Sequence, residues 1–274
     1  MKKQGSLTWL TILMLCVIIL THQTHVFASP APMAVTQYAD DQISYQTCGE
    51  KNSEKGVVFF LHGLGDNKTT HQKYIDTLAK AGFYVIAPDA YSHGNAPGSG
   101  STIIENVIMA KDMIDAMIER EQLVEENIYL YGYSMGGMTA YYYAANGKYP
   151  VKGIVSLIST PDFSSVKGNP LFYESYREKE KIGDEVIHTI DTMLDAANPL
   201  EKLSALNLPI YMDNGTNDPY MSIDGVRNAV MKLQNIVSLE REAAHTIGEQ
   251  EFMNGIYWLS SLAQTNTLVK NTND

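Results

Sequence analysis

Unbroken apolar runs, bounded by glycine, proline or polar residues, recur along the chain. The run at 57–61 follows Gly56, and the run at 83–87 ends at Pro88. Strands that are covered on both faces of a parallel sheet have this pattern. Similar runs predict strands at 128–131, 153–158, 209–212 and 236–239. The alternating stretch at 42–48 predicts an edge strand instead.

Stretches with helical spacing separate these runs. Between residues 102 and 122, apolar side chains recur every three or four positions and form one stripe that can be buried. Helices are predicted at 70–81, 102–122, 137–145, 222–234 and 250–263. Strands that alternate with helices over this length predict one α/β domain built on a doubly wound, mostly parallel sheet.

The alternation of strands and helices is interrupted between residues 160 and 208. Val186, Ile190 and Leu194 fall on one face of a helix within this stretch. We interpret 160–208 as a small helical cap inserted over the carboxyl edge of the sheet, where it would wall a substrate pocket. The alternative is an ordinary packed helix with a longer loop.

The first 28 residues have the pattern of a secretory signal peptide. Lys2 and Lys3 precede the apolar run 7–20, and a small residue, Ala28, closes the segment. The run is shorter than the ~20 residues that a membrane-spanning helix needs. We therefore expect cleavage after Ala28, a secreted mature domain of residues 29–274, and no stable membrane insertion afterwards. An uncleaved anchor is the alternative.

Composition narrows the classes of partner. The 274 residues carry a formal net charge of −11, which becomes −13 when the two lysines of residues 1–28 are removed. An acidic surface disfavours nucleic acid and anionic membranes. The mature chain keeps a single cysteine, Cys48, so no internal disulfide is expected. The sequence has no His-x-x-x-His pair and no cysteine cluster, so we expect no metal and no cofactor.

Ser134 stands at the centre of Gly132-Tyr133-Ser134-Met135-Gly136, between a predicted strand and a predicted helix. A tight turn in this context holds its central residue in a strained conformation, and small residues two positions away avoid a clash. Such a turn presents the serine hydroxyl near a helix N-terminus. By itself the motif is a weak signal, so it needs a base, an acid and oxyanion donors in support.

A serine hydroxyl is a poor nucleophile unless a base takes its proton. In folds with this strand–turn–helix nucleophile, the chain order is serine, acid, histidine. His245 lies in the loop after the last predicted strand and before the last helix. His188 also follows Ser134, but it belongs to the helix of the inserted stretch. His245 is therefore the candidate base, and the alternative is a surface-loop histidine.

The acid that orients the base is expected after the next-to-last strand. Asp218 lies in a glycine-containing loop beyond the end of that strand, from which it can point back to His245. Asp213 ends the strand itself, and Asp224 belongs to the start of the following helix. We therefore prefer Asp218, although an aspartate in such a loop can also serve as a turn or cap residue.

Two backbone N–H groups are needed to hold a developing oxyanion. Met135 follows the nucleophile and lies near a helix N-terminus, so its N–H is the first candidate. The second is expected from the loop after the strand at 57–61, where Gly63 and Gly65 let the backbone approach closely. Leu64 is our choice, and the alternative for His62-Gly63 is a plain turn that ends the strand.

These motifs together resemble the α/β-hydrolase superfamily, and most of all its small esterases of the dienelactone-hydrolase and prolyl-oligopeptidase-like type. The resemblance spans residues 57–262 and rests on His62-Gly63-Leu64-Gly65, Pro88-Asp89, the serine motif, Asn214-Gly215-Thr216-Asn217-Asp218 and His245. It implies an α/β-hydrolase fold, a Ser134/Asp218/His245 triad and an acyl-enzyme intermediate. The departures are Asn214, where many relatives have histidine, and Tyr91-Ser92-His93-Gly94 in place of Arg-Gly-x-Gly.

The sequence thus predicts an exported serine hydrolase that cleaves carboxylic esters of small molecules. Three alternatives use the same fold. They are a peptidase or amidase, an acyltransferase, and a non-catalytic binding protein.

Overall fold

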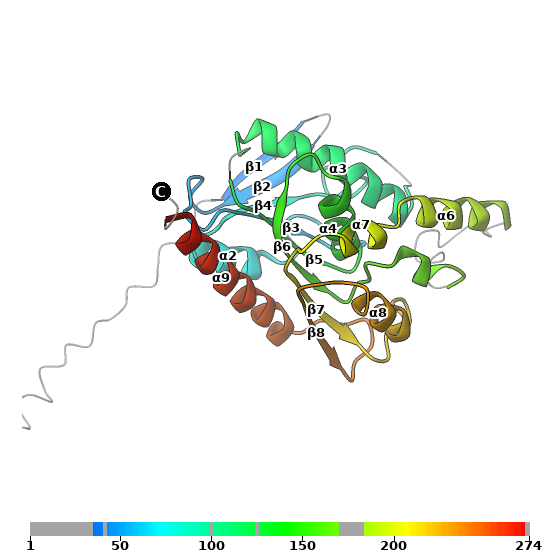
Figure 1. Ribbon diagram of the computed structural model, residues 1–274. Coiled ribbons are helices and arrows are strands. Elements are labelled where there is room, and N and C mark those ends of the chain that lie inside the picture. The colour runs from blue at the N-terminus through cyan, green and yellow to red at the C-terminus, as the bar shows by residue number, and fades with distance from the viewer. Residues whose placement is uncertain (1–34, 41–42, 99–100, 124–125, 170–183, 272–274) are drawn as a thin grey trace, which may run out of the picture. The chain divides into compact units, whose positions relative to one another are not determined.

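An eight-stranded sheet forms the centre of the part of the chain that the structure describes (Figure 1). The computed structural model describes residues 35–40, 43–98, 101–123, 126–169 and 184–271, all within one compact unit, Met33–Asp274. The strands are β1 (Val35–Ala39), β2 (Ser44–Cys48), β3 (Val57–Leu61), β4 (Tyr84–Pro88), β5 (Ile128–Tyr133), β6 (Val151–Leu157), β7 (Ile210–Gly215) and β8 (Ile236–Arg241).

The strands are ordered β1-β2-β4-β3-β5-β6-β7-β8 across the sheet. β1 pairs antiparallel with β2, and β2 pairs antiparallel with β4. All other neighbours are parallel. The predicted doubly wound, mostly parallel sheet is therefore confirmed. Because the carboxyl ends of parallel strands meet at one edge, the loops after β3, β5, β7 and β8 gather there.

The stretch at 42–48 is not the edge strand that its alternation predicts. β2 lies between β1 and β4, and all five of its residues are buried. The edge is β1, a short strand of exposed residues that the sequence pattern did not reveal. The alternation in β2 arises because polar Ser44, Gln46 and Thr47 are also buried, and two of them donate hydrogen bonds to groups that lie far away in the sequence.

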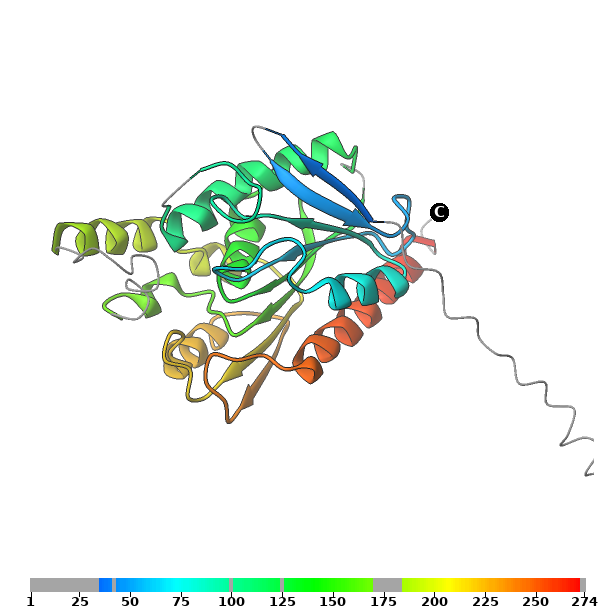
Figure 2. The same ribbon diagram turned by 180° about the vertical axis from the view of Figure 1, so that it is seen from behind.

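Helices cover both faces of the sheet (Figures 1 and 2). They are α2 (Gln72–Lys80), α3 (Ile103–Arg120), α4 (Met135–Asn146), α6 (Asp184–Ala196), α7 (Leu200–Ser204), α8 (Ile223–Val230) and α9 (Glu249–Asn271), with a short 3-10 helix η1 (Phe163–Val166).

The unbroken apolar run of β3 is explained by these two helical layers. Successive side chains of a strand point to opposite faces. Val57 and Phe59 pack in a cluster with α3, α4, α7 and α8. Val58 and Phe60 pack in a second cluster with α2 and α9. Each residue of the run is buried because both faces of the strand are covered.

The inserted stretch is described only in part, because residues 170–183 of 160–208 lie outside the described chain. Its described portion contains η1, α6 and α7. Ile190 and Leu194 of α6 pack with Ile104 of α3 and Met138 of α4, in a cluster that Leu64 also contacts. The predicted helix at this position is thus present and lies against residues of the candidate site. Whether it acts as a cap stays a prediction.

The predicted signal segment, residues 1–28, lies outside the described chain. Among the helices of the described ranges, none combines the length and the apolar character needed to cross a bilayer.

Candidate active site

Ser134 occupies the tight turn between β5 and α4. Its backbone has φ 51° and ψ −122°, a conformation that a non-glycine residue adopts only when its surroundings enforce it. The two flanking glycines allow this turn to form. A Cβ at Gly132 would lie 2.2 Å from the carbonyl oxygen of Gly136, and a Cβ at Gly136 would lie 2.1 Å from that of Leu61. The predicted strand–turn–helix geometry is therefore present at Ser134.

The structure brings His245 to Ser134 across 111 positions of sequence. Ser134 Oγ lies 2.9 Å from His245 Nε2, within hydrogen-bond distance. His245 comes from the loop between β8 and α9, and its side chain is 19% exposed. The ring of Tyr220 packs edge-on against the imidazole at 4.9 Å between centroids. The histidine is thus held in place while it stays open to the surface.

Asp218 completes this row of side chains. Its Oδ2 lies 2.7 Å from His245 Nδ1, and its side chain is fully buried. Its other oxygen, Oδ1, accepts hydrogen bonds from the backbone N–H groups of Tyr220 and Met221. These two bonds fix the carboxylate, so that it holds His245 with Nδ1 protonated and Nε2 facing Ser134.

The competing candidates lie elsewhere. Asp213 is part of β7, which runs on to Gly215, and its Oδ1 accepts a hydrogen bond from Arg241 Nε at 2.7 Å. Burial raises the pKa of Asp213 despite the nearby Arg241. Asp224 lies in the first turn of α8 and pairs with Arg227. His188 is an exposed residue of α6.

Both predicted oxyanion donors lie beside the serine. Leu64, Met135, Ser134 and His245 line one hollow with a cavity volume of about 170 Å³, together with Ile103, Met138, Tyr220 and Met221. Met135 is the first residue of α4, where an α-helix leaves its N–H groups without intrahelical acceptors. In the described chain, no hydrogen bond engages the N–H of Leu64.

His62 anchors the loop that carries Leu64, a role that sequence reasoning missed. Its Nδ1 lies 2.7 Å from the carbonyl oxygen of Gly63, and its Nε2 lies 2.9 Å from the backbone nitrogen of Ala90. Since the carbonyl can only accept and the backbone N–H can only donate, His62 is neutral with its proton on Nδ1. Burial lowers the pKa of His62 to about 4.

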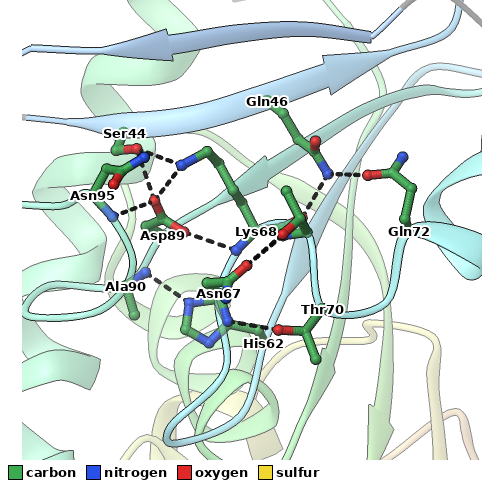
Figure 3. A network of polar contacts seen from close by, with 11 residues as sticks. Ser44, Gln46, His62, Asn67, Lys68, Thr70, Gln72, Asp89, Ala90 and Asn95 are labelled. Atoms are coloured by element: carbon green, nitrogen blue, oxygen red, sulfur yellow. Dashed lines mark hydrogen bonds and ion pairs between the residues drawn. The ribbon is translucent and has the colours of Figure 1, made fainter.

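A buried ion pair fastens the same loop from its other end (Figure 3). Lys68 Nζ lies 2.5 Å from Asp89 Oδ2, and the two side chains are 5% and 0% exposed. Asp89 also accepts hydrogen bonds from the backbone N–H of Lys68, from that of Asn95 and from the Ser44 hydroxyl. Burial alone would raise the pKa of Asp89, but these bonds, chiefly those from Lys68, lower it.

His62 and the Lys68–Asp89 pair have one effect in common. Each ties the loop after β3 to the loop after β4, one before Leu64 and the other after it. Backbone N–H groups stabilise an oxyanion only if they are held in place before the charge develops. The loop geometry is therefore suited to a preorganised donor at Leu64.

A second hollow lies on another side of Ser134. Its cavity volume is about 240 Å³, and it shares Leu64, Ser134 and His245 with the first hollow. The first hollow, which Met135, Met138 and Met221 line, is called the methionine-lined hollow below. The second hollow differs from it because Asp66, His71 and Phe252 contribute to its walls. Where the chain is described, no group of three or more histidine, cysteine or acidic side chains is arranged to hold a metal ion. Cys48 is buried and free.

Comparison with known proteins finds one matching family model and relatives that are named as a peptidase and an esterase. The family model for the alpha/beta hydrolase fold matches residues 56–180. A proline iminopeptidase of Clostridioides difficile is 34% identical over 124 residues, which are 45% of this chain and 41% of that relative. Esterase YjfP of Escherichia coli is 25% identical over 189 residues, 64% of this chain and 74% of that relative. The match thus spans less than half of the iminopeptidase.

Solved structures share the fold at low sequence identity. A monoacylglycerol lipase of Paleococcus ferrophilus has a TM-score of 0.62 at 23% identity, covering 81% of this chain and 99% of that one. An esterase of Pyrococcus furiosus has a TM-score of 0.59 at 17% identity, covering 85% and 90%. With the sheet order and the family match, they confirm the fold that the sequence motifs predict. The chain therefore has the α/β-hydrolase fold, and the family match together with the relatives named as esterase and lipase supports a hydrolase enzyme.

Proposed function

We propose that the protein is a serine hydrolase that cleaves carboxylic esters through Ser134, His245 and Asp218. The proposal rests on one observation, the continuous row Ser134 Oγ, His245, Asp218 with contacts of 2.9 Å and 2.7 Å. A nucleophile next to a base, with the base oriented by a third group, is the arrangement that covalent acyl transfer requires.

Each residue of the row has a defined part in the proposed reaction. Ser134 Oγ attacks the ester carbonyl while His245 Nε2 takes its proton. Asp218 keeps Nδ1 protonated and stabilises the imidazolium that forms. The N–H groups of Leu64 and Met135 hold the oxyanion of the tetrahedral intermediate. His245 then protonates the leaving alcohol, and water, activated by the same histidine, releases the acid from the acyl-enzyme.

The methionine-lined hollow supports a small ester with an apolar part. Its walls are mostly aliphatic side chains, and it opens directly onto Ser134. An apolar pocket with a few polar groups at one end is the usual form of a small-molecule site. The relatives that are called esterase and lipase agree with this substrate class.

Turnover of p-nitrophenyl esters with two to eight acyl carbons tests the proposal, with Ser134→Ala as the matched variant. We expect hydrolysis by the native protein and a loss of several orders of magnitude in kcat for Ser134→Ala. Equal rates for the two proteins, or no turnover of any ester in the series, would reject a Ser134 esterase.

Peptide hydrolysis is the second candidate, because a proline iminopeptidase is among the relatives. The amine of an amide leaves less readily than the alcohol of an ester, so a peptidase must also bind the amine that departs. Release of p-nitroaniline from proline p-nitroanilide distinguishes a peptidase from an esterase. A kcat/KM for the anilide that equals or exceeds that for the esters would favour the peptidase.

We also propose that the protein is exported after removal of residues 1–28. The support is the basic start, the short apolar run and the small residue at position 28. N-terminal sequencing of the protein recovered outside the cytoplasm decides this point. A sequence that starts near Ser29 agrees with export by cleavage, whereas an intact Met1 contradicts it.

A further inference from the structure

The second hollow beside Ser134 carries a negative charge that the proposed triad does not use. Asp66 lines this hollow, and its side chain is 31% exposed, so solvent or substrate can reach it. The carboxylate is oriented, because its Oδ2 accepts a hydrogen bond from the Tyr133 hydroxyl at 2.6 Å. Tyr133 directly precedes the nucleophile, so the position of Asp66 is tied to that of Ser134.

The charge of Asp66 is not neutralised within the hollow. None of the described residues that line it is a lysine or an arginine. His71 Nε2 lies 3.9 Å from Asp66 Oδ2, beyond hydrogen-bond distance, and burial lowers the pKa of His71, which favours its neutral form. Within the described chain, the other oxygen, Asp66 Oδ1, accepts no hydrogen bond. The carboxylate therefore has capacity left for a cation.

Aromatic rings form part of this surface, next to the aliphatic side chains of Ile158 and Ile247. His71 contacts the ring of Tyr133 edge-on at 4.8 Å and the ring of Phe252 at 5.0 Å. Phe252 is stacked on Tyr74 at 4.0 Å and cannot move away without loss of that contact. Aromatic faces attract cations, and an ammonium group benefits most where a carboxylate is close by.

We propose that the hollow formed by Asp66, His71, Tyr133 and Phe252 is a subsite for an ammonium group of the substrate. The inference rests on the proposed esterase function. The apolar half of an ester would lie in the methionine-lined hollow, and its cationic half would lie against Asp66. An ester of a trimethylammonium alcohol or acid has this chemistry.

Two pairs of esters that differ in one charge test the subsite. The first is choline acetate with its carbon isostere 3,3-dimethylbutyl acetate, which places the charge on the alcohol. The second is p-nitrophenyl 4-(trimethylammonio)butanoate with p-nitrophenyl 5,5-dimethylhexanoate, which places it on the acyl group. Within a pair, shape and volume are the same, so the ratio of kcat/KM reports the charge alone.

We expect the native protein to prefer the charged ester of at least one pair by about tenfold or more. Asp66→Asn keeps the shape of the side chain and should remove most of that ratio, mainly through KM. Asp112→Asn is the control, because its side chain on α3 is 88% exposed. It should leave the ratio unchanged. Equal turnover within both pairs, or a ratio that survives Asp66→Asn, would overturn the subsite.

Binding to a protein that cannot turn over separates this proposal from the esterase assignment. In Ser134→Ala, calorimetry should detect choline acetate, and the added change Asp66→Asn should weaken its binding about tenfold. This result holds even if no ester is hydrolysed by the native protein. Binding that Asp66→Asn does not change, or no binding at all, would overturn the subsite while the esterase could stand.

Discussion

Asp218 Oδ2 lies 2.7 Å from His245 Nδ1, and no part of the Asp218 side chain is exposed. A buried carboxylate at this distance holds the imidazole in one tautomer, with Nε2 free to take a proton. This relationship separates Asp218 from Asp213, which lies in β7 and pairs with Arg241.

Replacement of the two aspartates by asparagine tests which of them is the catalytic acid. Asp218→Asn removes the charge that orients and stabilises His245, so kcat for p-nitrophenyl acetate should fall by about 10³–10⁴ with little change in KM. Asp213→Asn should keep kcat within about tenfold of the native value, since Asp213 does not contact His245. The reverse order of the two losses would move the acid to Asp213.

Loss of the His62 side chain should weaken oxyanion stabilisation without any change in the triad. His62→Gln cannot hold both the Gly63 carbonyl and the Ala90 N–H in the native geometry, so the N–H of Leu64 loses its fixed position. We expect kcat to fall by about 10-fold to 100-fold, somewhat less than complete removal of an oxyanion donor. KM should stay within a few fold.

The control for His62 is its neighbour His93. The two rings lie 5.3 Å apart, but His93 bonds to the Tyr91 carbonyl within its own loop. His93→Gln should therefore keep kcat near the native value. Equal losses for both variants would contradict a specific role of His62 in the oxyanion loop.

The buried state of His62 also predicts how stability depends on pH. Burial lowers its pKa to about 4, whereas an unfolded histidine titrates near 6.5. Between these values the unfolded chain binds a proton that the folded chain does not. The free energy of unfolding should therefore decrease as the pH falls from about 6.5 to 4.

Urea unfolding at pH 7 and pH 4.5 measures this dependence. The depressed pKa of His62 corresponds to a loss on the order of 3 kcal/mol across the full interval. His62→Gln lacks the titrating group, so its stability should change less between the two pH values. A variant whose loss on acidification matches that of the native protein would argue against His62 as its source.

The alternation of strands and helices could be predicted because burial on both sheet faces leaves an unbroken apolar run. β1 could not be predicted, since its residues are exposed and its order comes from pairing with β2. β7 continues to Gly215, beyond the end that the apolar run 209–212 predicts. Asp213 and Asn214 are polar residues that normally signal a loop, but here they are buried in the strand, and Arg241 from β8 pairs with Asp213.

The candidate triad could be predicted from chain order, because each member follows its own strand. The contacts that hold the loop of Leu64 in place could not be predicted from the sequence. His62 accepts a hydrogen bond from Ala90, and Lys68 pairs with Asp89, so both contacts depend on the approach of two loops about 20 to 30 residues apart. Asp66 was visible in the sequence as the end of a glycine-rich loop. Its contact with Tyr133 and its place in the wall of the second hollow appear only in the structure.

The Lys68–Asp89 pair should contribute strongly to stability. Lys68→Met leaves the buried Asp89 carboxylate without its cation, so we expect a loss of about 3–5 kcal/mol in the free energy of unfolding. Lys148→Met is the matched control. Lys148 pairs with Glu119 at the surface, where the two side chains are 60% and 52% exposed.

Urea unfolding at pH 7 compares the two lysine variants. The midpoint for Lys148→Met should stay near that of the native protein, because exposed ion pairs are well screened by water. The midpoint for Lys68→Met should fall clearly, with an unchanged slope. Similar midpoints for both variants would show that the buried pair contributes no more to the free energy of unfolding than the exposed pair.

Covalent labelling of the nucleophile tests the role of Ser134 most directly. A fluorophosphonate reacts far faster with a serine that an adjacent base activates than with an ordinary serine. The intact mass should therefore rise by one label, which peptide mapping should locate at Ser134. Asp218→Asn should slow the labelling strongly, and Ser134→Ala should abolish it. No label on the native protein, or a label on a residue other than Ser134, would contradict the assignment of Ser134 as the catalytic nucleophile.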